Sequence, residues 1–326
     1  MVTYQDISEA YHRIRHLVVK TPLLTSDRLN DRLGFRLFIK AEPLQRIGAF
    51  KFRGACNALL SLPDDAKQII AFSSGNHAQA ISLVARLTGR HATIIMPQDA
   101  PQAKIDATHS YGAEVVLYDR YRDSREEIGA QLTKERGATL VKPYDDERVI
   151  CGQGTIGIEL ASQIKDHGVS PSAVYCCAGG GGLISGLSIA LHHSHRDLAI
   201  YAAEPEHFDD IARSLESGTI CQNDPQARSI CDAIVTPAPG EITFPIMKAH
   251  LAGGVSVSDD DCLRAMQSAW RHLKLVVEPG GAVGIAAALA LRDDASIKGK
   301  DVIAIASGGN VDDAMFERAL AMTGAL

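Results

Sequence analysis

The sequence predicts an α/β protein with two unequal, mostly parallel sheets and a cleft at the ends of their strands. Two observations predict it. Short apolar runs alternate with amphipathic stretches of helical length along the chain, and several runs end at clusters of glycine and hydroxyl residues, where a helical pattern begins. Strands buried on both faces give continuous apolar runs, and helices connect parallel neighbours. With 326 residues and 46% hydrophobic content, the chain can bury a sizeable core.

The first four predicted strands follow one another closely. Helical stretches near residues 77–88, 102–110 and 123–136 separate them. The strands are Ile69–Phe72, Ala92–Met96, Glu114–Tyr118 and Thr139–Val141. Together they predict one small α/β unit.

A second series of strands is predicted in the remaining part of the chain. Its members are Ala173–Cys177, Ala199–Ala203, Gly254–Val257 and Val302–Ala306. One of the helices between them is predicted to begin at Ser258, because Ser258 and Asp261 have the spacing of a capping box, with Asp in place of the usual Glu. No linker rich in proline, glycine or serine divides the two series.

Composition and charge exclude several classes of protein. The net charge is −6 and no cluster of lysine and arginine stands out, so we expect no nucleic-acid partner. No apolar run is long enough to span a bilayer, and the first residues do not form a leader peptide, so we expect no membrane partner and a cytoplasmic protein. The seven cysteines form no C-x-x-C pair, which argues against a disulfide framework and against a zinc site.

A lysine in an aromatic setting is the most informative feature. Residues 49–55 read Ala-Phe-Lys-Phe-Arg-Gly-Ala, so Lys51 lies between two phenylalanines and close to Arg53. Apolar flanks and a neighbouring cation both disfavour an ammonium and lower its pKa, which suits a lysine that forms a Schiff base. A structural lysine at a helix start, beside a core pair, would give the same pattern.

Two glycine-bearing segments favour the chemical interpretation. Ser73-Ser74-Gly75-Asn76-His77 and Gly179-Gly180-Gly181-Gly182 each follow an apolar run, and a helical pattern begins directly after each. Hydroxyls and backbone N–H groups converge at such helix starts and can hold a carboxylate or a phosphate. A glycine run can also be a flexible linker, but linkers do not lie tightly between a strand and a helix.

These motifs resemble the fold-type II enzymes of pyridoxal 5′-phosphate (PLP), in the branch of serine racemase, serine/threonine dehydratase and 3-hydroxyaspartate dehydratase. Seven motifs occur in the family order over nearly the whole chain. Besides the three above, they are Gly152-Gln153-Gly154-Thr155, Ala203-Glu204-Pro205, Glu278-Pro279 and Ser307-Gly308-Gly309-Asn310. The resemblance implies a PLP cofactor in the cleft between a large domain, residues 1–67 and 146–326, and a small inserted α/β domain, residues 68–145.

The resemblance assigns the cofactor contacts residue by residue. Lys51 would carry the cofactor and later take the Cα proton of the substrate, Phe50 would pack on the pyridine ring, and Asn76 would bond to the ring hydroxyl. Gly179, Gly180, Gly181 and Gly182 would bind the phosphate. Ser307 would contact the pyridine nitrogen, and Glu278 would lie near the cofactor. A neutral serine does not demand a protonated ring, which favours elimination over transamination. Phe50 would also fit an ordinary core position.

Segment 73–77 is implied to hold the substrate carboxylate through Ser73, Ser74, Gly75, Asn76 and His77. Ser74 bears on the reaction, because in racemases of this family the matching serine exchanges a proton on the face opposite the lysine, and dehydratases carry it too. The sequence therefore leaves open a dehydratase (ammonia-lyase), which yields a 2-oxo acid and ammonia, and a serine racemase with dehydratase side activity. A non-catalytic phosphate-binding protein, in which the lysine is structural, is the alternative from another class.

The substrate class follows from a further likeness. The segment 118–125, Tyr-Asp-Arg-Tyr-Arg-Asp-Ser-Arg, looks most like microbial serine racemases and 3-hydroxyaspartate dehydratases. We therefore place 3-hydroxyaspartate beside L-serine and L-threonine. Its second carboxylate needs a cation, for which Arg125, Arg148 and His77 are candidates. Each arginine would equally fit a surface ion pair.

An acidic turn is the candidate metal site. Glu204 and Asp210 occur in Glu-Pro-Glu-His-Phe-Asp-Asp after a predicted strand, a spacing that lets two carboxylates and the Phe208 carbonyl face one hard cation. From the residues alone, a solvated acidic turn is the better interpretation. The resemblance favours the cation, because serine racemases and their relatives bind Mg2+, Mn2+ or Ca2+ at the matching position.

Three departures from the family pattern limit this transfer of roles. Ala49 replaces a common serine, Asp232-Ala233 replaces Asp-Gly, and Gly280 replaces a serine or threonine after Glu278-Pro279. The lysine role survives these changes. Substrate preference could change with the lost hydroxyl.

The resemblance also implies partners and regulation. It predicts an amino-acid substrate and a homodimer. Arg46, Gln79 and Tyr111 fall near the positions at which animal serine racemases bind a nucleotide, a partial match that leaves ATP open as an effector. No segment like the regulatory domain of biosynthetic threonine deaminases follows Leu326, so we expect no feedback inhibition by isoleucine.

Overall fold

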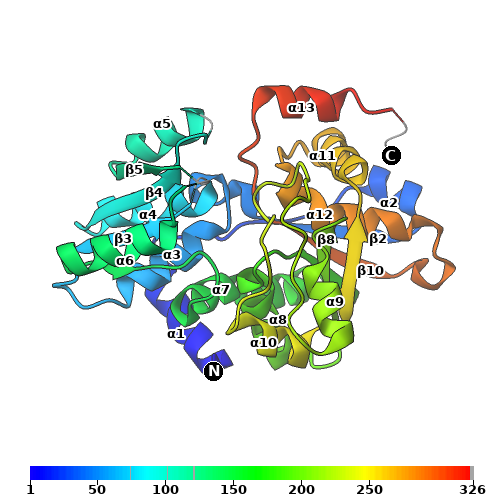
Figure 1. Cartoon of the computed structure of the whole chain (residues 1–326). Coiled ribbons are helices and arrows are strands. Elements are labelled where there is room, and N and C mark those ends of the chain that lie inside the picture. The colour runs from blue at the N-terminus through cyan, green and yellow to red at the C-terminus, as the bar shows by residue number, and fades with distance from the viewer. Residues whose placement is uncertain (74, 101, 120–121, 324–326) are drawn as a thin grey trace.

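The computed structural model describes residues 1–73, 75–100, 102–119 and 122–323 of the protein. Its strands form two separate sheets with helices packed against them, and Figure 1 shows the smaller sheet on the left and the larger on the right. This is the α/β class that the alternating apolar runs predict.

The larger sheet has six strands in the order β1-β2-β10-β7-β8-β9. All neighbours are parallel except β1, which runs antiparallel to β2. The strands are β1 (Leu23–Leu24), β2 (Arg36–Ala41), β7 (Pro171–Cys177), β8 (Ala199–Pro205), β9 (Gly253–Val257) and β10 (Asp301–Ala306). The second predicted series is confirmed as β7 to β10. The short β1 and the charge-bearing β2 are additional strands that the apolar runs do not predict.

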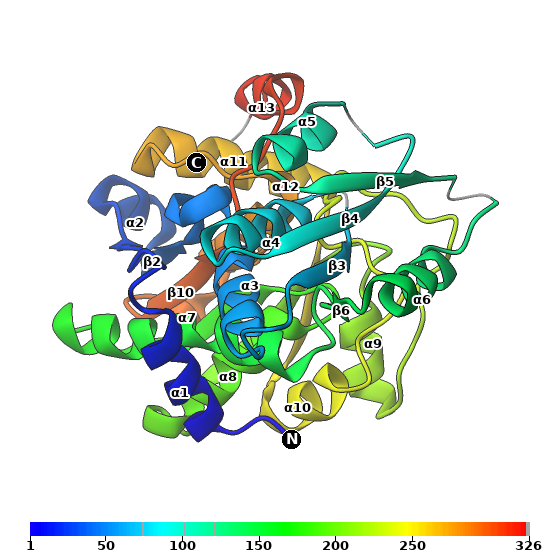
Figure 2. The ribbon, with the colours of Figure 1, turned by 90° about the vertical axis from the view of Figure 1, so that its left-hand side faces the viewer.

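The smaller sheet has four parallel strands in the order β5-β4-β3-β6, which Figure 2 shows side by side. Its strands are β3 (Gln68–Phe72), β4 (His91–Pro97), β5 (Glu114–Tyr118) and β6 (Thr139–Leu140), and its helices are α4 (Asn76–Leu87), α5 (Gln102–Ser110) and α6 (Arg125–Arg136). The first predicted series is confirmed. Separate domains with boundaries at residues 68 and 145 stay a prediction.

Ten further α-helices lie before β3 or after β6 in the described residues. They are α1 (Tyr4–Ile14), α2 (Asp27–Leu33), α3 (Lys51–Leu60), α7 (Glu147–Asp166), α8 (Gly182–Ser194), α9 (Asp210–Ser217), α10 (Thr243–His250), α11 (Asp259–Leu273), α12 (Pro279–Leu289) and α13 (Asp313–Leu320). The predicted capping box opens α11: the Asp261 N–H donates to Ser258 Oγ, and the Ser258 N–H donates to the Asp261 carboxylate, both at 3.2 Å.

Helix α7 is the longest helix and packs against both α3 and α8. Glycine makes this approach close. A Cβ at Gly152 would lie 2.5 Å from the carbonyl oxygen of Arg53, and a Cβ at Gly186 would lie 2.3 Å from that of Ile150. The helix backbones therefore touch directly. This contact fixes the position of α3 against α7, and the first residue of α3 is Lys51.

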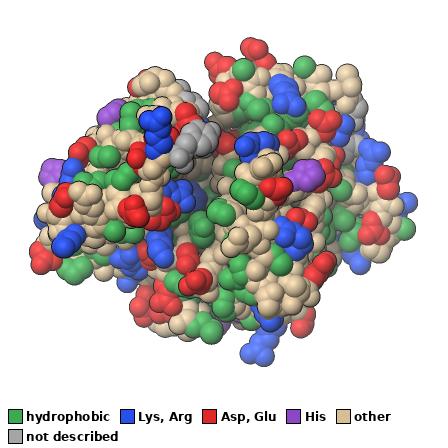
Figure 3. All heavy atoms as spheres, in the orientation of Figure 1, with side chains coloured by type: hydrophobic (Ala, Val, Ile, Leu, Met, Phe, Trp, Pro, Cys, Tyr) green, Lys and Arg blue, Asp and Glu red, His purple; other side chains and the backbone are tan. Residues whose placement is uncertain are grey.

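The surface carries charges of both signs. On the face drawn in Figure 3, lysine and arginine side chains are interspersed with aspartate and glutamate. An ion pair between Lys104 on α5 and Asp232 joins the smaller sheet's helices to a loop of the larger part. Within the described ranges, no helix combines the length and the apolar character needed to cross a membrane.

Candidate active site

Lys51 lies where three distant segments meet. Its Nζ donates a 2.7 Å hydrogen bond to the carbonyl of Pro143, just after β6. The Phe50 N–H donates at 3.0 Å to the carbonyl of Ser307, at the end of β10. The Lys51 Nζ is 5.2 Å from the centre of the Phe50 ring. Lys51 and its neighbour Phe50 are thus fixed to the carboxyl edges of the two sheets.

Burial lowers the pKa of Lys51 to about 8, and the nearby Cys177 thiol opposes that shift. The expectation that Arg53 also lowers this pKa is wrong. The Arg53 guanidinium is buried among the carboxylates of Glu42 and Glu159, which neutralise its charge. Desolvation by the apolar surroundings is therefore the cause of the lowered pKa.

One cavity brings Lys51 and the glycine run together. It is lined by Phe50, Lys51, Tyr144 and all four glycines from 179 to 182, with Cys177 at the end of β7. Gln153 and Thr236 also line the cavity, and Nε2 of Gln153 and Oγ1 of Thr236 are buried without a hydrogen-bond partner in the structure. The cavity therefore combines polar lining residues with the amine of Lys51.

Two glycines in this run have definite steric reasons. Gly181 precedes α8 with a φ of 89°, in the left-handed region. A Cβ at Gly180 would lie 2.2 Å from the Tyr144 ring, which covers the loop. Helix α8 has no side-chain cap, so backbone N–H groups at its start can bind an anion.

A chain of amides connects the first turn of α4 with Glu278. Asn76 Nδ2 donates to Glu278 Oε1, and Asn310 Nδ2 donates to Asn76 Oδ1, each at 2.7 Å. Burial raises the pKa of Glu278 to about 8, against the opposing hydrogen bond from Asn76. Ser307 is buried at the end of β10, beside Phe50. Asn76 and Glu278 are therefore joined to each other, and Ser307 is fixed beside the residue that precedes the lysine.

The segment after β3 is arranged as a turn into α4. Ser73 Oγ accepts a hydrogen bond from the Gly75 N–H at 3.1 Å. His77 Nε2 lies 3.1 Å from the Val141 carbonyl, while its Nδ1 is buried without a partner. Burial lowers the pKa of His77 to about 3, so the ring is neutral and the expectation that it supplies a cation is wrong. Ser74 lies outside the described residues.

The two candidate arginines differ in their surroundings. Arg125 begins α6, and its guanidinium lies 5.8 Å from the ring of Phe72, the last residue of β3. Its Nε donates to Glu126 at 2.8 Å. Arg148 instead donates through Nε and Nη2 to Asp146, at the start of α7. Arg125 thus lies beside the last residue of β3, while Asp146, the partner of Arg148, acts electrostatically on His77.

The acidic turn places two carboxylates together at the start of α9. The oxygens of Glu204 accept the N–H groups of Ile211 and Ala212 at 2.8 and 2.9 Å. Burial, then the charge of Asp210, raises the pKa of Glu204 to about 8, and burial raises that of Asp210 to about 6. One oxygen of Asp210 is buried without a partner. The described residues contain no group of three His, Cys, Asp or Glu side chains arranged for a metal.

Several residues at the site carry no role in the sequence interpretation. Tyr144 covers the glycine run, Thr236 lines the cavity, and Asn310 bridges Asn76 to the Ile47 carbonyl. Asn310 belongs to the Ser-Gly-Gly-Asn motif and Tyr144 follows a strand, so the sequence offers a reason to assign both to the site. It offers no such reason for Thr236.

The segments of the nucleotide expectation lie around α4. The segment of Arg46 contacts α4, which carries Gln79. The ring of Tyr111 lies 5.8 Å from the guanidinium of Arg86 on the same helix. These contacts leave nucleotide binding a prediction.

A family model described as "Pyridoxal-phosphate dependent enzyme" matches residues 14–308. The chain belongs to this family. Membership favours an enzyme over the non-catalytic phosphate-binding alternative, and it makes pyridoxal phosphate the cofactor.

Individual members of the pyridoxal-phosphate dependent family are similar over almost the whole chain. The L-threo-3-hydroxyaspartate ammonia-lyase of Saccharomyces cerevisiae is 44% identical and the serine racemase of Schizosaccharomyces pombe is 41% identical, each over 95% of this chain and 94% of its own length. The solved serine racemase of Dictyostelium discoideum is 38% identical with a TM-score of 0.87, covering 95% of this chain and 99% of that one.

The residues around Lys51 fit this cofactor. The uncapped start of α8 offers backbone N–H groups to a phosphate. Gln153 and Thr236, two polar residues that each carry an unpartnered polar atom, line the same cavity. An amine with a lowered pKa suits the aldehyde of the cofactor.

Proposed function

We propose that this enzyme is a PLP-dependent ammonia-lyase that eliminates the hydroxyl group of a β-hydroxy-α-amino acid, with 3-hydroxyaspartate as its first substrate and L-serine and L-threonine as weaker ones. The products are a 2-oxo acid and ammonia. The observation that carries the proposal is the Lys51 amine, desolvated and in the same cavity as the glycine run. The ammonia-lyase from S. cerevisiae supports the substrate.

The cofactor would be held at both ends. The backbone N–H groups of glycines 179–182 hold its phosphate, as the uncapped start of α8 allows. Phe50 would pack on its ring, Asn76 and Glu278 would contact its polar edge, and Ser307 would contact the ring nitrogen. When bound, pyridoxal phosphate supplies an electron sink for the pair of electrons left when the Cα proton is removed.

Lys51 acts as the base that takes the Cα proton at Nζ. A pKa of about 8 lets the neutral amine be populated near physiological pH. The carbonyl of Pro143 orients that nitrogen through the 2.7 Å hydrogen bond. The neutral His77, with Ser73, Gly75 and Asn76, helps to hold the α-carboxylate of the substrate.

Arg125 is the proposed partner of the second carboxylate of hydroxyaspartate. It lies at the ring of Phe72, directly before Ser73, and its Nε donates to the neighbouring Glu126. A planar guanidinium binds a carboxylate through two parallel hydrogen bonds, so the residue would favour the diacid over serine.

A serine racemase is the second candidate. The relative from S. pombe carries that name, and the sequence has Ser74 at the position from which the second proton would come. The two candidates differ in product, because a racemase returns the opposite enantiomer and a lyase returns a 2-oxo acid.

We further propose that Glu204, Asp210 and the Phe208 carbonyl bind a divalent cation, Mg2+, Mn2+ or Ca2+. Two buried carboxylates with raised pKa values and an unpartnered oxygen support this. A homodimer in the cytoplasm and regulation by ATP complete the proposal. They are supported only by the family resemblance.

Product analysis tests the activity. The purified protein, loaded with pyridoxal phosphate and Mg2+, is offered L-serine, L-threonine and both diastereomers of L-3-hydroxyaspartate, and 2-oxo acid and chirality are followed together. We expect oxaloacetate from the threo diastereomer to dominate. Dominant D-serine would establish the racemase instead, and dominant pyruvate or 2-oxobutanoate would establish a general dehydratase.

Two substitutions localise the chemistry. Lys51→Ala should abolish turnover and the visible absorbance of the lysine-bound cofactor; a coloured, active variant would contradict the role of Lys51.

Arg125→Gln should reduce kcat/KM for hydroxyaspartate at least about tenfold more than for serine. Arg122→Gln is the matched control, because Arg122 is 85% exposed in the same segment.

A further inference from the structure

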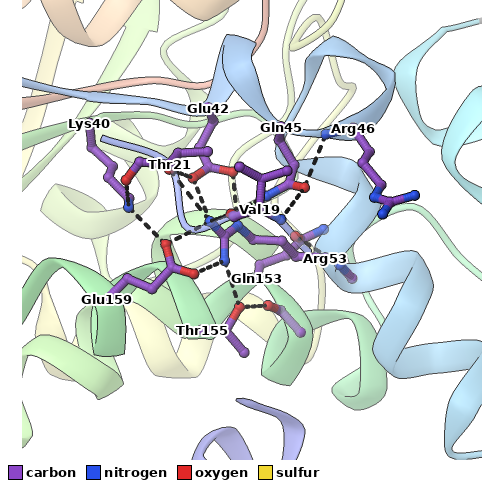
Figure 4. Close-up of polar contacts among 12 residues, drawn as sticks. Val19, Thr21, Lys40, Glu42, Gln45, Arg46, Arg53, Gln153, Thr155 and Glu159 are labelled. Atoms are coloured by element: carbon purple, nitrogen blue, oxygen red, sulfur yellow. Dashed lines mark hydrogen bonds and ion pairs between the residues drawn. The ribbon is translucent and has the colours of Figure 1, made fainter. Parts of the chain in front are cut away.

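Two of the largest fully buried side chains among the described residues are charged, Lys40 and Arg53. With Glu42 and Glu159 they form a group that we call the Arg53 cluster, drawn in Figure 4. No side chain of the cluster is more than 2% exposed. Two cations and two carboxylates balance, so the cluster carries no net charge.

Arg53 is gripped by both carboxylates at once. Its Nε and Nη2 donate to the two oxygens of Glu42, both at 2.9 Å. Its Nη1 and Nη2 donate to the two oxygens of Glu159, both at 2.8 Å. Two bidentate pairs share one planar guanidinium, a geometry that a lysine ammonium cannot reproduce. Lys40 Nζ adds a 2.8 Å bond to Glu159.

The cluster fixes the first turn of α3. Arg53 is the third residue of this helix, two positions after Lys51, and the helix has no side-chain cap at its start. Glu42 comes from the short 3-10 segment that follows β2, and Glu159 from the middle of α7. An uncapped helix end tends to fray. Here its first turn is instead held by the buried pairs on two sides.

The same cluster reaches the turn that leads into Lys51. Ile47 has a φ of 59°, a left-handed conformation that is strained for a β-branched residue. The Val19 carbonyl accepts two hydrogen bonds, one from Arg53 Nη2 at 3.2 Å and one from Gln45 Nε2 at 2.8 Å. Gln45 lies two residues before Ile47. Asn310 Nδ2 donates to the Ile47 carbonyl at 2.7 Å. The strained turn is thus held between Val19, which touches the cluster, and Asn310.

We propose that Arg53 is a positioning residue for Lys51: its two bidentate pairs fix the first turn of α3 and so hold the Lys51 amine at the carbonyl of Pro143, within the cavity. The inference rests on the proposed function, in which Lys51 is the base. Small displacements of a reacting group cost rate steeply. A buried ion group adds little stability over apolar packing of the same volume, so stability alone is a poor account of four buried charges.

The test replaces the guanidinium of Arg53 by an ammonium and so keeps the positive charge. In Arg53→Lys, the amine of Lys51 is titrated in the cofactor-free protein by competitive labelling with acetic anhydride from about pH 6 to about pH 11, read by mass spectrometry of the Lys51 peptide. The titratable groups near Lys51 in the described residues include Cys177 from β7, His77 from α4 and Tyr144 of the cavity lining, and none of these is altered.

We expect the pKa of Lys51 to rise by about one unit or more toward the ordinary lysine value of about 10.4, because a loosened turn lets the ammonium reach water. In the loaded enzyme, kcat should fall about tenfold or more while KM changes less than about twofold. A merely structural cluster would leave the pKa of Lys51 unchanged.

Arg36→Lys is the matched control. Arg36 forms one bidentate pair with Asp301 on the larger sheet, both bonds at 2.6 Å, so the same chemical change is made away from α3. If Arg53→Lys does not fold, Glu159→Gln is the second variant, because it weakens the bidentate pair with Arg53 and keeps the shape of the side chain. An unchanged Lys51 titration in a folded cluster variant overturns the proposal. The titration uses no substrate, so a wrong substrate would appear only in the product analysis.

Discussion

Two pairs of buried carboxylates in this protein have opposite surroundings. In the Arg53 cluster, burial alone would raise the pKa of Glu159, but the hydrogen bonds and charges of Arg53 and Lys40 outweigh it and lower the pKa. At the start of α9, burial and mutual repulsion raise the pKa of Glu204 to about 8. Both sites are equally dry. The partner, not the burial, therefore decides whether a buried carboxylate is charged.

The two sites also differ in whether every carboxylate oxygen has a hydrogen-bond partner. Every carboxylate oxygen of Glu42 and Glu159 accepts a hydrogen bond from a cation. At the acidic turn, one oxygen of Asp210 has no partner. A positive charge supplied from solution would complete the second site and would only disturb the first.

The largest effect is expected from removing one charge of the complete site. Glu42→Gln should lower the free energy of unfolding by about 3 kcal/mol or more, because it leaves part of the Arg53 charge buried and unpaired. Urea unfolding monitored by circular dichroism measures it. The matched change Glu204→Gln, in EDTA, should lower it by less than about 1 kcal/mol or raise it, since it removes a repulsion. Equal losses in both variants would refute the comparison.

Addition of a cation should have the next largest effect. Mg2+, Mn2+ or Ca2+ at about one hundred times its Kd should add about 2.7 kcal/mol to the stability of the native protein, and chelation should remove it. Thermal unfolding with and without EDTA checks this. In a Glu204→Gln, Asp210→Asn variant the cation should have no effect; a stabilisation that persists would place the ion elsewhere.

The stability of the cation-free protein should fall as pH rises from about 5 to about 8. The folded pKa values of Asp210, about 6, and of Glu204, about 8, exceed those of the unfolded chain. The native state therefore binds protons more tightly, a contribution that is full below the unfolded values and lost as pH rises through the folded ones. The double variant should show a flatter profile, measured by urea unfolding at several pH values.

A half-exposed ion pair gives the smallest effect and sharpens the argument. Arg264 lies near Asp260 and Asp261 on α11, and its side chain is 39% exposed. Arg264→Ala should change the free energy of unfolding by about 0.5 kcal/mol or less, because water screens the pair. A loss as large as that of Glu42→Gln would mean that ion pairing itself, rather than burial, sets the energy.

Local patterns predict most of the fold, but not the contacts between distant segments. The apolar runs predict eight of the strands, because strands buried in a parallel sheet need continuous apolar sequence. They miss β2, since Arg36 and Lys40 interrupt its run. Lys40 can lie in a buried strand only because Glu159 meets it from 119 positions away. No local pattern carries that pairing.

The same limit applies to the site. The position of Lys51 beside the glycine run follows from motifs at strand ends, which parallel sheets bring to one edge. The effect of Arg53 on Lys51 was predicted wrongly, because its carboxylate partners lie on other elements. His77 was predicted as a cation because burial cannot be read from its own residue type.

The strand order has a consequence for how the chain is made. Strand β10 lies between β2 and β7 in the larger sheet, yet it begins only at Asp301. The smaller sheet is complete in the sequence by Leu140. On the ribosome, the smaller sheet can therefore pair all its strands while β2 and β7 still lack their shared neighbour. The surface that later carries Lys51 and the cofactor can close only when the last strand has left the ribosome.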